Sequence, residues 1–273
     1  MRSSNPVFSS LAGTKQRAVQ NQFQGYPADP YSQYPSAGAV TSERPMTVDD
    51  VISKTGITLG VIIVMAVINF GIAMFISPVL AMVLTIVGAI GGLVTVLIGT
   101  FGKKYGSAAI TLIYAFFEGL FVGGISLLFS GFLVGKGADA GTMIGQAVLG
   151  TVGVFLGMLY VYKTGAVKVT PKFQRIMTAC LMGVLVLALG NMALFFFTGM
   201  NPLTNGGPLA IIFSLVCIGL AAFSFLQDFD AADQLVRAGA PARMAWGVAL
   251  GLAVTLVWLY TEILRLLSYF RGN

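Results

Sequence analysis

Long apolar runs alternate with short polar breaks along most of the chain. No charged residue occurs in 55–102, 140–162 or 176–227, and each run exceeds the roughly 20 apolar residues that a bilayer-spanning helix needs. Breakers such as Ser77-Pro78 divide these runs further. The pattern predicts an all-α polytopic membrane protein whose transmembrane helices are 56–76, 79–100, 107–132, 141–162, 176–198, 209 to about 230, and about 244 to 270.

Composition narrows the function classes. Charged residues make up only 10% of the chain and hydrophobic residues 56%, whereas soluble domains carry roughly 25% charged residues, so a soluble enzyme and a nucleic-acid-binding module are excluded. The absence of His removes His-based catalysis and His metal sites. Cys180 and Cys217 lie in apolar runs and are interpreted as small core residues. We expect no enzymatic activity, no resident cofactor or metal, and no nucleic-acid partner.

The first 50 residues differ from the rest. Residues 26–38 are rich in Pro, Tyr, Ser and Gln and cannot bury enough apolar area to offset the ordering entropy. Residues 1–50 are therefore predicted to be a disordered tail before a transmembrane domain at 51–273. The tail is either a docking segment or a tolerated extension. We expect the tail not to be a signal peptide, because no apolar stretch follows Arg2. The sequence Thr47-Val-Asp-Asp50 predicts a helix N-cap and a short amphipathic helix that enters the membrane.

The basic residues predict the orientation. Thirteen of the 16 Lys and Arg fall in the tail or in loops on the same side as the tail, which places the N-terminus in the cytoplasm and the C-terminus outside. Arg265 and Arg271 oppose this assignment, which leaves a partly re-entrant last segment as an alternative. Pairs of small residues four apart predict close helix packing: Gly56/Gly60, Gly88/Gly92, Gly119/Gly123, Gly153/Gly157 and Gly247/Gly251.

The few acids in the apolar region are the candidate functional residues, because a charge at the bilayer centre costs at least about 2.5–3.5 kcal/mol. Glu118 lies about 16 Å along a helix that starts at Ser107, near mid-membrane. It is either a proton- or cation-responsive carboxyl or a neutral acid bonded to a neighbouring helix. Asp228, Asp230 and Asp233 cluster at the expected end of helix 209–230. They are either a solvated helix end or, because acids at a helix C-terminus oppose the helix dipole, residues with a function, Asp228 above all.

Glu262 belongs to the last helix. One interpretation is an intrahelical pair with Arg265 at i, i+3. The functional interpretation requires a partner from another helix.

Three passages resemble the Bax inhibitor-1 family, also called the transmembrane Bax-inhibitor-motif or YccA-like family, in an actinobacterial-type branch. They are 114–126, 225–235 and 259–267, and the resemblance covers about 50–270. It implies seven helices with the last one central, and a pH-sensitive calcium leak in which acids on the sixth and seventh helices pair. By motif position these acids are Asp228 or Asp230, together with Glu262. A basic partner after the second helix would be Lys103 or Lys104.

The chain departs from that family pattern in three places. Glu262 stands where the family has Asp, Lys stands where Arg is expected, and the connection 239–243 is longer. If the last helix enters the membrane at Met244, Glu262 lies about 27 Å along it, on the opposite face from Asp228. Pairing then requires the last helix to begin well inside the cytoplasm.

The acid pair that the resemblance implies would act as a proton-competed calcium gate. Two carboxyls that share one proton titrate as a coupled pair, and losing that proton lets them part or recruit a transient Ca²⁺. The alternatives are a regulator that binds a membrane protease or another membrane complex, and a secondary transporter, for which no internal repeat is evident. An intramembrane hydrolase that uses two acids is a further alternative, but the chain lacks an obvious Gly-x-Gly-Asp pattern. The lipid bilayer is the expected surrounding, a bacterial inner membrane the expected location, and the oligomeric state stays open.

Overall fold

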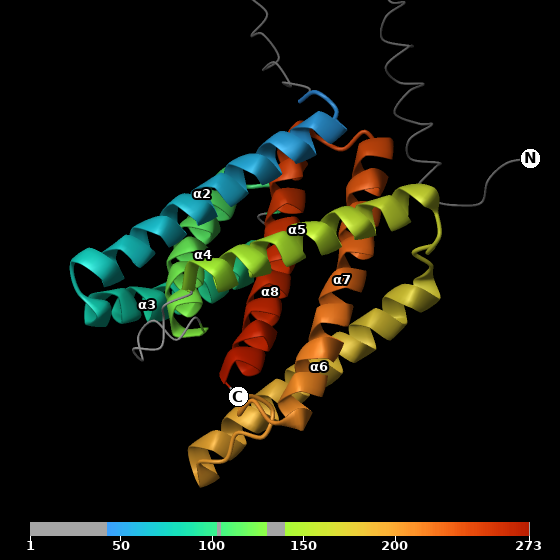
Figure 1. Cartoon of the computed structure of the whole chain (residues 1–273). Helices are drawn as coiled ribbons and strands as arrows, with labels where there is room; N and C mark the ends of the chain where they lie inside the picture. Colours follow the sequence, from blue (N-terminus) through green and yellow to red (C-terminus); the bar gives the residue numbers. More distant parts are fainter. Residues whose placement is uncertain (1–42, 103–104, 130–139, 273) are drawn as a thin grey trace, which may run out of the picture. The chain divides into compact units, whose positions relative to one another are not determined.

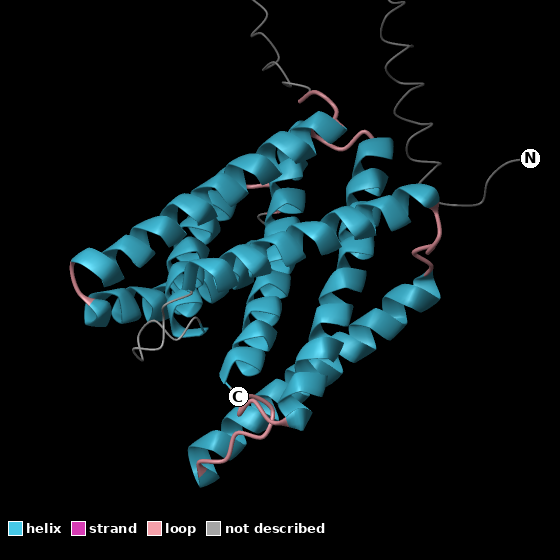
Figure 2. Ribbon diagram, viewed as in Figure 1, coloured by secondary structure: helices cyan, strands magenta, loops and turns pink. Residues whose placement is uncertain are grey.

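Seven helices long and apolar enough to cross a membrane make up most of the described chain. The computed structural model describes residues 43–102, 105–129 and 140–272 (Figure 1), and Figure 2 shows helices joined by short loops. The expected all-α membrane fold is confirmed. The helices are α2 (Val48–Phe75), α3 (Pro78–Phe101), α4 (Ala108–Phe129), α5 (Ala140–Thr164), α6 (Pro171–Thr198), α7 (Pro208–Arg237) and α8 (Ala245–Gly272).

Two boundaries differ by seven or eight residues from those expected, and α6 begins five residues earlier than expected, at Pro171. Helix α2 begins at Val48, because Thr47 and Asp50 form a reciprocal capping box there. The predicted amphipathic segment is therefore continuous with the first span, and residues 43–50 belong to the helical unit. Helix α7 continues to Arg237, well past the expected end near 230, through a run of good helix formers supported by an Asp233–Arg237 ion pair. The predicted disorder of the tail concerns 1–42, outside the described residues.

Glycines set the spacing of the first three spans. A methyl group on Gly88 of α3 would lie 2.5 Å from the Phe117 carbonyl oxygen of α4, and one on Gly119 would lie 2.5 Å from the Ile62 carbonyl oxygen of α2. Only glycine allows such backbone approach. The pairs Gly88/Gly92 and Gly119/Gly123 thus lie at helix contacts as predicted, whereas Gly153/Gly157 of α5 faces open space.

Helix α8 is the most deeply buried span. It packs against α2, α4, α5 and α7, and it runs beside α7 in Figure 1. Its contact with α7 is built from fully buried small, aliphatic and aromatic side chains, including Ala221, Leu259 and Phe225. Helix α6 packs mainly on α7 and exposes most of its surface. That α8 is encircled by all six other helices stays a prediction.

The segment before α2 forms backbone hydrogen bonds with the loop between α7 and α8. We call residues 43–47 together with 238–244 the clasp. Met46 N donates to the Ala240 carbonyl at 2.7 Å, and Ala242 N donates to the Arg44 carbonyl at 3.0 Å. Arg44 also forms two hydrogen bonds with Asp50, at 2.6 and 2.8 Å. The Met46 side chain is only 2% exposed and packs into the cluster that contains Phe225 and Leu252. The inserted connection therefore forms part of a structured contact.

Candidate functional site

Asp228 faces α8 from the inner surface of α7. Its Oδ2 accepts a hydrogen bond from Thr255 Oγ1 at 2.7 Å. Gly251, one turn earlier on α8, lies beside the carboxyl, and a methyl group there would make an ordinary van der Waals contact with Asp228 Oδ1 at 3.9 Å. The Thr255 hydroxyl also lies 3.2 Å from the Gly251 carbonyl. Asp228 is thus held between the two helices by a neutral donor, without a paired cation among the described residues.

Tyr105 covers this position from the loop between α3 and α4. Its ring packs on Gly247, where a methyl group would lie 2.5 Å from ring carbon Cε1. Desolvation raises the pKa of the Tyr105 hydroxyl, and the nearby charge of Asp228 raises it further. The phenol therefore stays neutral at physiological pH. It therefore provides a neutral polar group near Asp228.

The other two aspartates of α7 find partners at the surface. Asp230 accepts a hydrogen bond from Gln234 Nε2 at 2.7 Å on the same helix. Asp233 pairs with Arg237 Nε at 2.9 Å and lies 3.4 Å from the Tyr162 hydroxyl. The structure therefore places Asp228, rather than Asp230, against α8. Asp228 also lies well before the end of α7, so the expected clash with the helix dipole does not arise, because the dipole acts within the last turn.

Glu262 is the most deeply buried acid of the described chain, with 4% of its surface exposed. Arg265 Nη1 lies 3.0 Å from Oε1 and 3.3 Å from Oε2, within the same helix. Ser214 of α7 donates to Oε2 at 3.3 Å. The intrahelical pair and the interhelical partner, weighed as alternatives from the sequence, are therefore both present. The partner from α7 is a serine rather than an aspartate.

The two acids share one interface but do not touch. Along α8, Thr255 and Glu262 lie on the same face about 10 Å apart, and no hydrogen bond joins Asp228 to Glu262 in the described residues. Between their positions the interface is filled by Ala221 and Leu259, both fully buried. The expected direct carboxyl pair is therefore not formed. Because α7 extends to Arg237, Asp228 nevertheless lies inside the bundle rather than at its face, which removes most of the separation that the sequence implied.

Glu118 belongs to a different interface. Its carboxyl lies over Gly92 of α3, where a methyl group would lie 2.7 Å from Oε2. Tyr114, one turn earlier on α4 and buried, interacts with the same carboxyl. Glu118 thus bonds within the packed α3–α4 pair and does not join the acids of α7 and α8.

The remaining candidate residues are the three basic ones predicted as electrostatic partners. Arg265 pairs with Glu262 and lies over the Phe129 ring, 5.7 Å from its centroid. Lys103 and Lys104 lie outside the described residues. Within the described ranges no three His, Cys, Asp or Glu side chains gather as a metal site would require.

Three residues of this site were missed from the sequence. Thr255 and Ser214 are short hydroxyl side chains within apolar helices, and Tyr105 lies in a loop. One signal could have found Thr255 and Ser214. Thr255 precedes Glu262 by seven positions and Ser214 precedes Asp228 by fourteen, and both spacings return to the same helix face. Two polar residues on one face of each helix predict a shared polar interface.

Comparison with known proteins supports the resemblance. The sequence profile described as Bax inhibitor 1 like matches residues 5–272, nearly the whole chain. No curated protein sequence matches the chain. The chain therefore belongs to the Bax inhibitor 1 like family.

Proposed function

We propose that the protein is a pH-sensitive calcium leak whose ion route follows the α7–α8 interface. One observation carries this proposal. Asp228 and Glu262 lie at the same helix interface, about two turns apart, within segments that are otherwise apolar. Acids inside a membrane are costly, and they mark ion or proton pathways when they face the bundle interior.

In the closed route, each acid is held by a different partner. The Glu262 charge is neutralised by Arg265, and Asp228 is held by Thr255. Between them Ala221 and Leu259 exclude water, and an apolar constriction of this kind blocks ions by dewetting. The two carboxyls therefore act in sequence along a route, instead of sharing one proton as predicted from the sequence.

Opening requires α7 to shift against α8, so that Leu259 leaves Ala221 and the Glu262–Arg265 pair loosens. A proton on Asp228 removes the negative charge that attracts a cation, whereas the ionised carboxylate is a hard oxygen ligand suited to calcium. Protons and calcium thus compete for Asp228. The sign follows: calcium flux rises with pH.

The proposal also includes the orientation of the protein and the membrane in which it lies. The bias of Lys and Arg toward the side of the tail supports a cytoplasmic N-terminus. The clasp and Tyr105 would then face the cytoplasm, and the Glu262–Arg265 pair would lie toward the outer side. A bacterial inner membrane remains the proposed location.

The test is calcium uptake into dye-loaded proteoliposomes made with the full chain. Wild type is compared with Asp228→Asn and Glu262→Gln, and Asp233→Asn serves as the matched control because its carboxyl already pairs at the surface. Both site variants should change the flux, while the control should match wild type. Equal flux in all four proteins would contradict the route. No flux above empty liposomes would favour the alternative, a regulator of a membrane protease or another membrane complex.

A further inference from the structure

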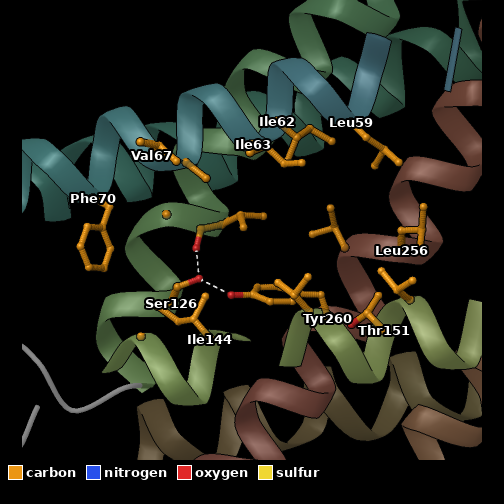
Figure 3. Close-up of a pocket in the computed structure, with 17 residues that line it drawn as sticks. Leu59, Ile62, Ile63, Val67, Phe70, Ser126, Ile144, Thr151, Leu256 and Tyr260 are labelled. Carbon is orange, nitrogen blue, oxygen red and sulfur yellow. Dashed lines mark hydrogen bonds between the residues drawn. The ribbon is translucent and has the colours of Figure 1, made fainter. Parts of the chain in front are cut away.

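A hollow in the side of the bundle lies apart from the acids. It has a volume of about 490 Å³, within the roughly 300–1,000 Å³ range of small-ligand pockets. Helices α2 and α5 form its two walls, and α4 and α8 form its floor (Figure 3). Its rim residues Ile63 and Val67 are 62% and 65% exposed, whereas the floor residues Val257 and Tyr260 are 7% and 8% exposed. The hollow therefore opens sideways between two spanning helices.

The lining offers water no free hydrogen-bond donor. Three hydroxyl groups face the hollow, and the proton of each one is already donated. Thr151 donates to the Ala147 carbonyl at 2.8 Å, and Ser126 donates to the Val122 carbonyl at 2.5 Å. The Tyr260 hydroxyl then donates to Ser126 Oγ, at a distance of 2.8 Å, and Figure 3 marks this contact. A roomy site that is otherwise apolar and has no free donor is poorly suited to ordered water, which needs two to four polar partners.

The position of the hollow identifies the chemistry of its occupant. Its α2 wall begins at Leu59, about 16 Å along that helix, so its mouth lies at the depth of the lipid chains. The lining residues, all of them within the described ranges, carry no charge that could hold a headgroup. We infer that the hollow is a binding site for one acyl chain of a phospholipid, which enters between α2 and α5 and reaches Tyr260 on α8.

This site is independent of the proposed ion route, because none of its lining residues belongs to the α7–α8 contact of Asp228 or Glu262. It places a lipid chain against the opposite face of α8. Binding is favoured by apolar contact along the walls and disfavoured by the ordering of the chain. A side chain that fills the hollow should therefore abolish binding without touching the carboxyls.

The experiment uses the full chain in phosphatidylcholine nanodiscs that contain a phosphatidylcholine with a diazirine in the middle of one acyl chain. Illumination followed by peptide mass spectrometry maps the adducts. We expect adducts on the buried floor, at Val257 and Tyr260, as well as on exposed surfaces. Val148→Trp, which fills the hollow from α5, should remove most floor adducts. Leu149→Trp, on the next residue but 74% exposed and outside the hollow, should keep them.

A second pair of variants, on α2, keeps the test decisive if Val148→Trp fails to fold. Val67→Trp fills the hollow from α2, and Ile68→Trp is its control. Adducts confined to outward residues such as Leu149 would overturn the proposal. Floor adducts that persist in both filling variants would overturn it as well. A parallel sample with a diazirine fatty acid separates the sources, since floor labelling by the free acid alone would exclude a phospholipid.

Discussion

Thr255 of α8 donates a 2.7 Å hydrogen bond to the carboxylate of Asp228 on α7. This contact joins the two helices of the proposed ion route at the point where an acid enters the bundle. Thr255 is only 7% exposed, so its hydroxyl is the principal donor available to Asp228 from the neighbouring helix. The pair fixes which of three nearby aspartates faces the interior.

Removing this donor should destabilise the protein. We expect Thr255→Val, which keeps the shape of the side chain, to lower the free energy of unfolding by about 1–3 kcal/mol because a buried acceptor loses its partner. Thermal unfolding in detergent measures the change. Thr178→Val is the control, because Thr178 is exposed and donates only to the Gln174 carbonyl of its own helix. If Asp228→Asn and Thr255→Val were additive in the double variant, the two residues would not be coupled.

The Glu262–Arg265 pair gives a second prediction. Arg265→Ala leaves the buried carboxyl of Glu262 without its cation, and the loss of one partner of a buried pair costs about 3–5 kcal/mol. The double variant Glu262→Gln/Arg265→Met should recover most of that stability, because no buried charge then remains. Unfolding midpoints of the three proteins decide the outcome. A double variant as unstable as Arg265→Ala would show that packing, rather than charge, makes Arg265 necessary.

Close glycine contacts give a third prediction. Gly88→Ala should destabilise the α3–α4 pair, because its methyl group would lie 2.5 Å from a backbone oxygen that cannot move aside. Gly157→Ala on α5 meets nothing within 4 Å and should be neutral or slightly stabilising, since Ala favours helix by up to about 1 kcal/mol over Gly. The two proteins are compared by thermal unfolding. Equal effects would mean that α3 and α4 are not packed as closely as described.

The clasp gives a fourth prediction. Met46→Ala should cost about 2–5 kcal/mol, because it empties a fully packed position between α7 and α8. It should also speed limited proteolysis within 238–244, since the loop loses its cover. Val48→Ala, at a position 60% exposed, is the control. Unchanged cleavage of the loop in Met46→Ala would show that the clasp does not hold it.

The number and type of helices could be predicted from the sequence, because the thickness of the membrane determines how long an apolar run must be to span it. The sequence pattern placed the end of α7 too early, because the acids at 228–233 resembled a solvated helix end, whereas Asp233 and Arg237 support another two turns of helix. Asp228 and Glu262 were identified as candidates because acids are rare in such segments. Their mutual distance could not be predicted, because it depends on how far α7 and α8 slide past each other.

The unknown register of α7 against α8 also explains why the hydrogen-bond partners of the two acids were missed. Ser214 and Thr255 are ordinary residues for a membrane helix, and only the register of α7 against α8 brings each one to a carboxyl. The clasp was missed for a similar reason. Residues 43–47 pair with a loop almost 200 positions away, and no local pattern signals such a contact.

Calcium flux into proteoliposomes at pH 6 and pH 8, with wild type beside Asp228→Asn, tests whether Asp228 lies on a proton-competed calcium route. We expect wild-type flux to rise from pH 6 to pH 8, because the ionised Asp228 carboxylate attracts calcium and its protonated form does not. Asp228→Asn, which cannot ionise, should lose that rise. A wild-type flux that falls or stays level between the two pH values, or a variant that keeps the full rise, would show that Asp228 does not control calcium entry.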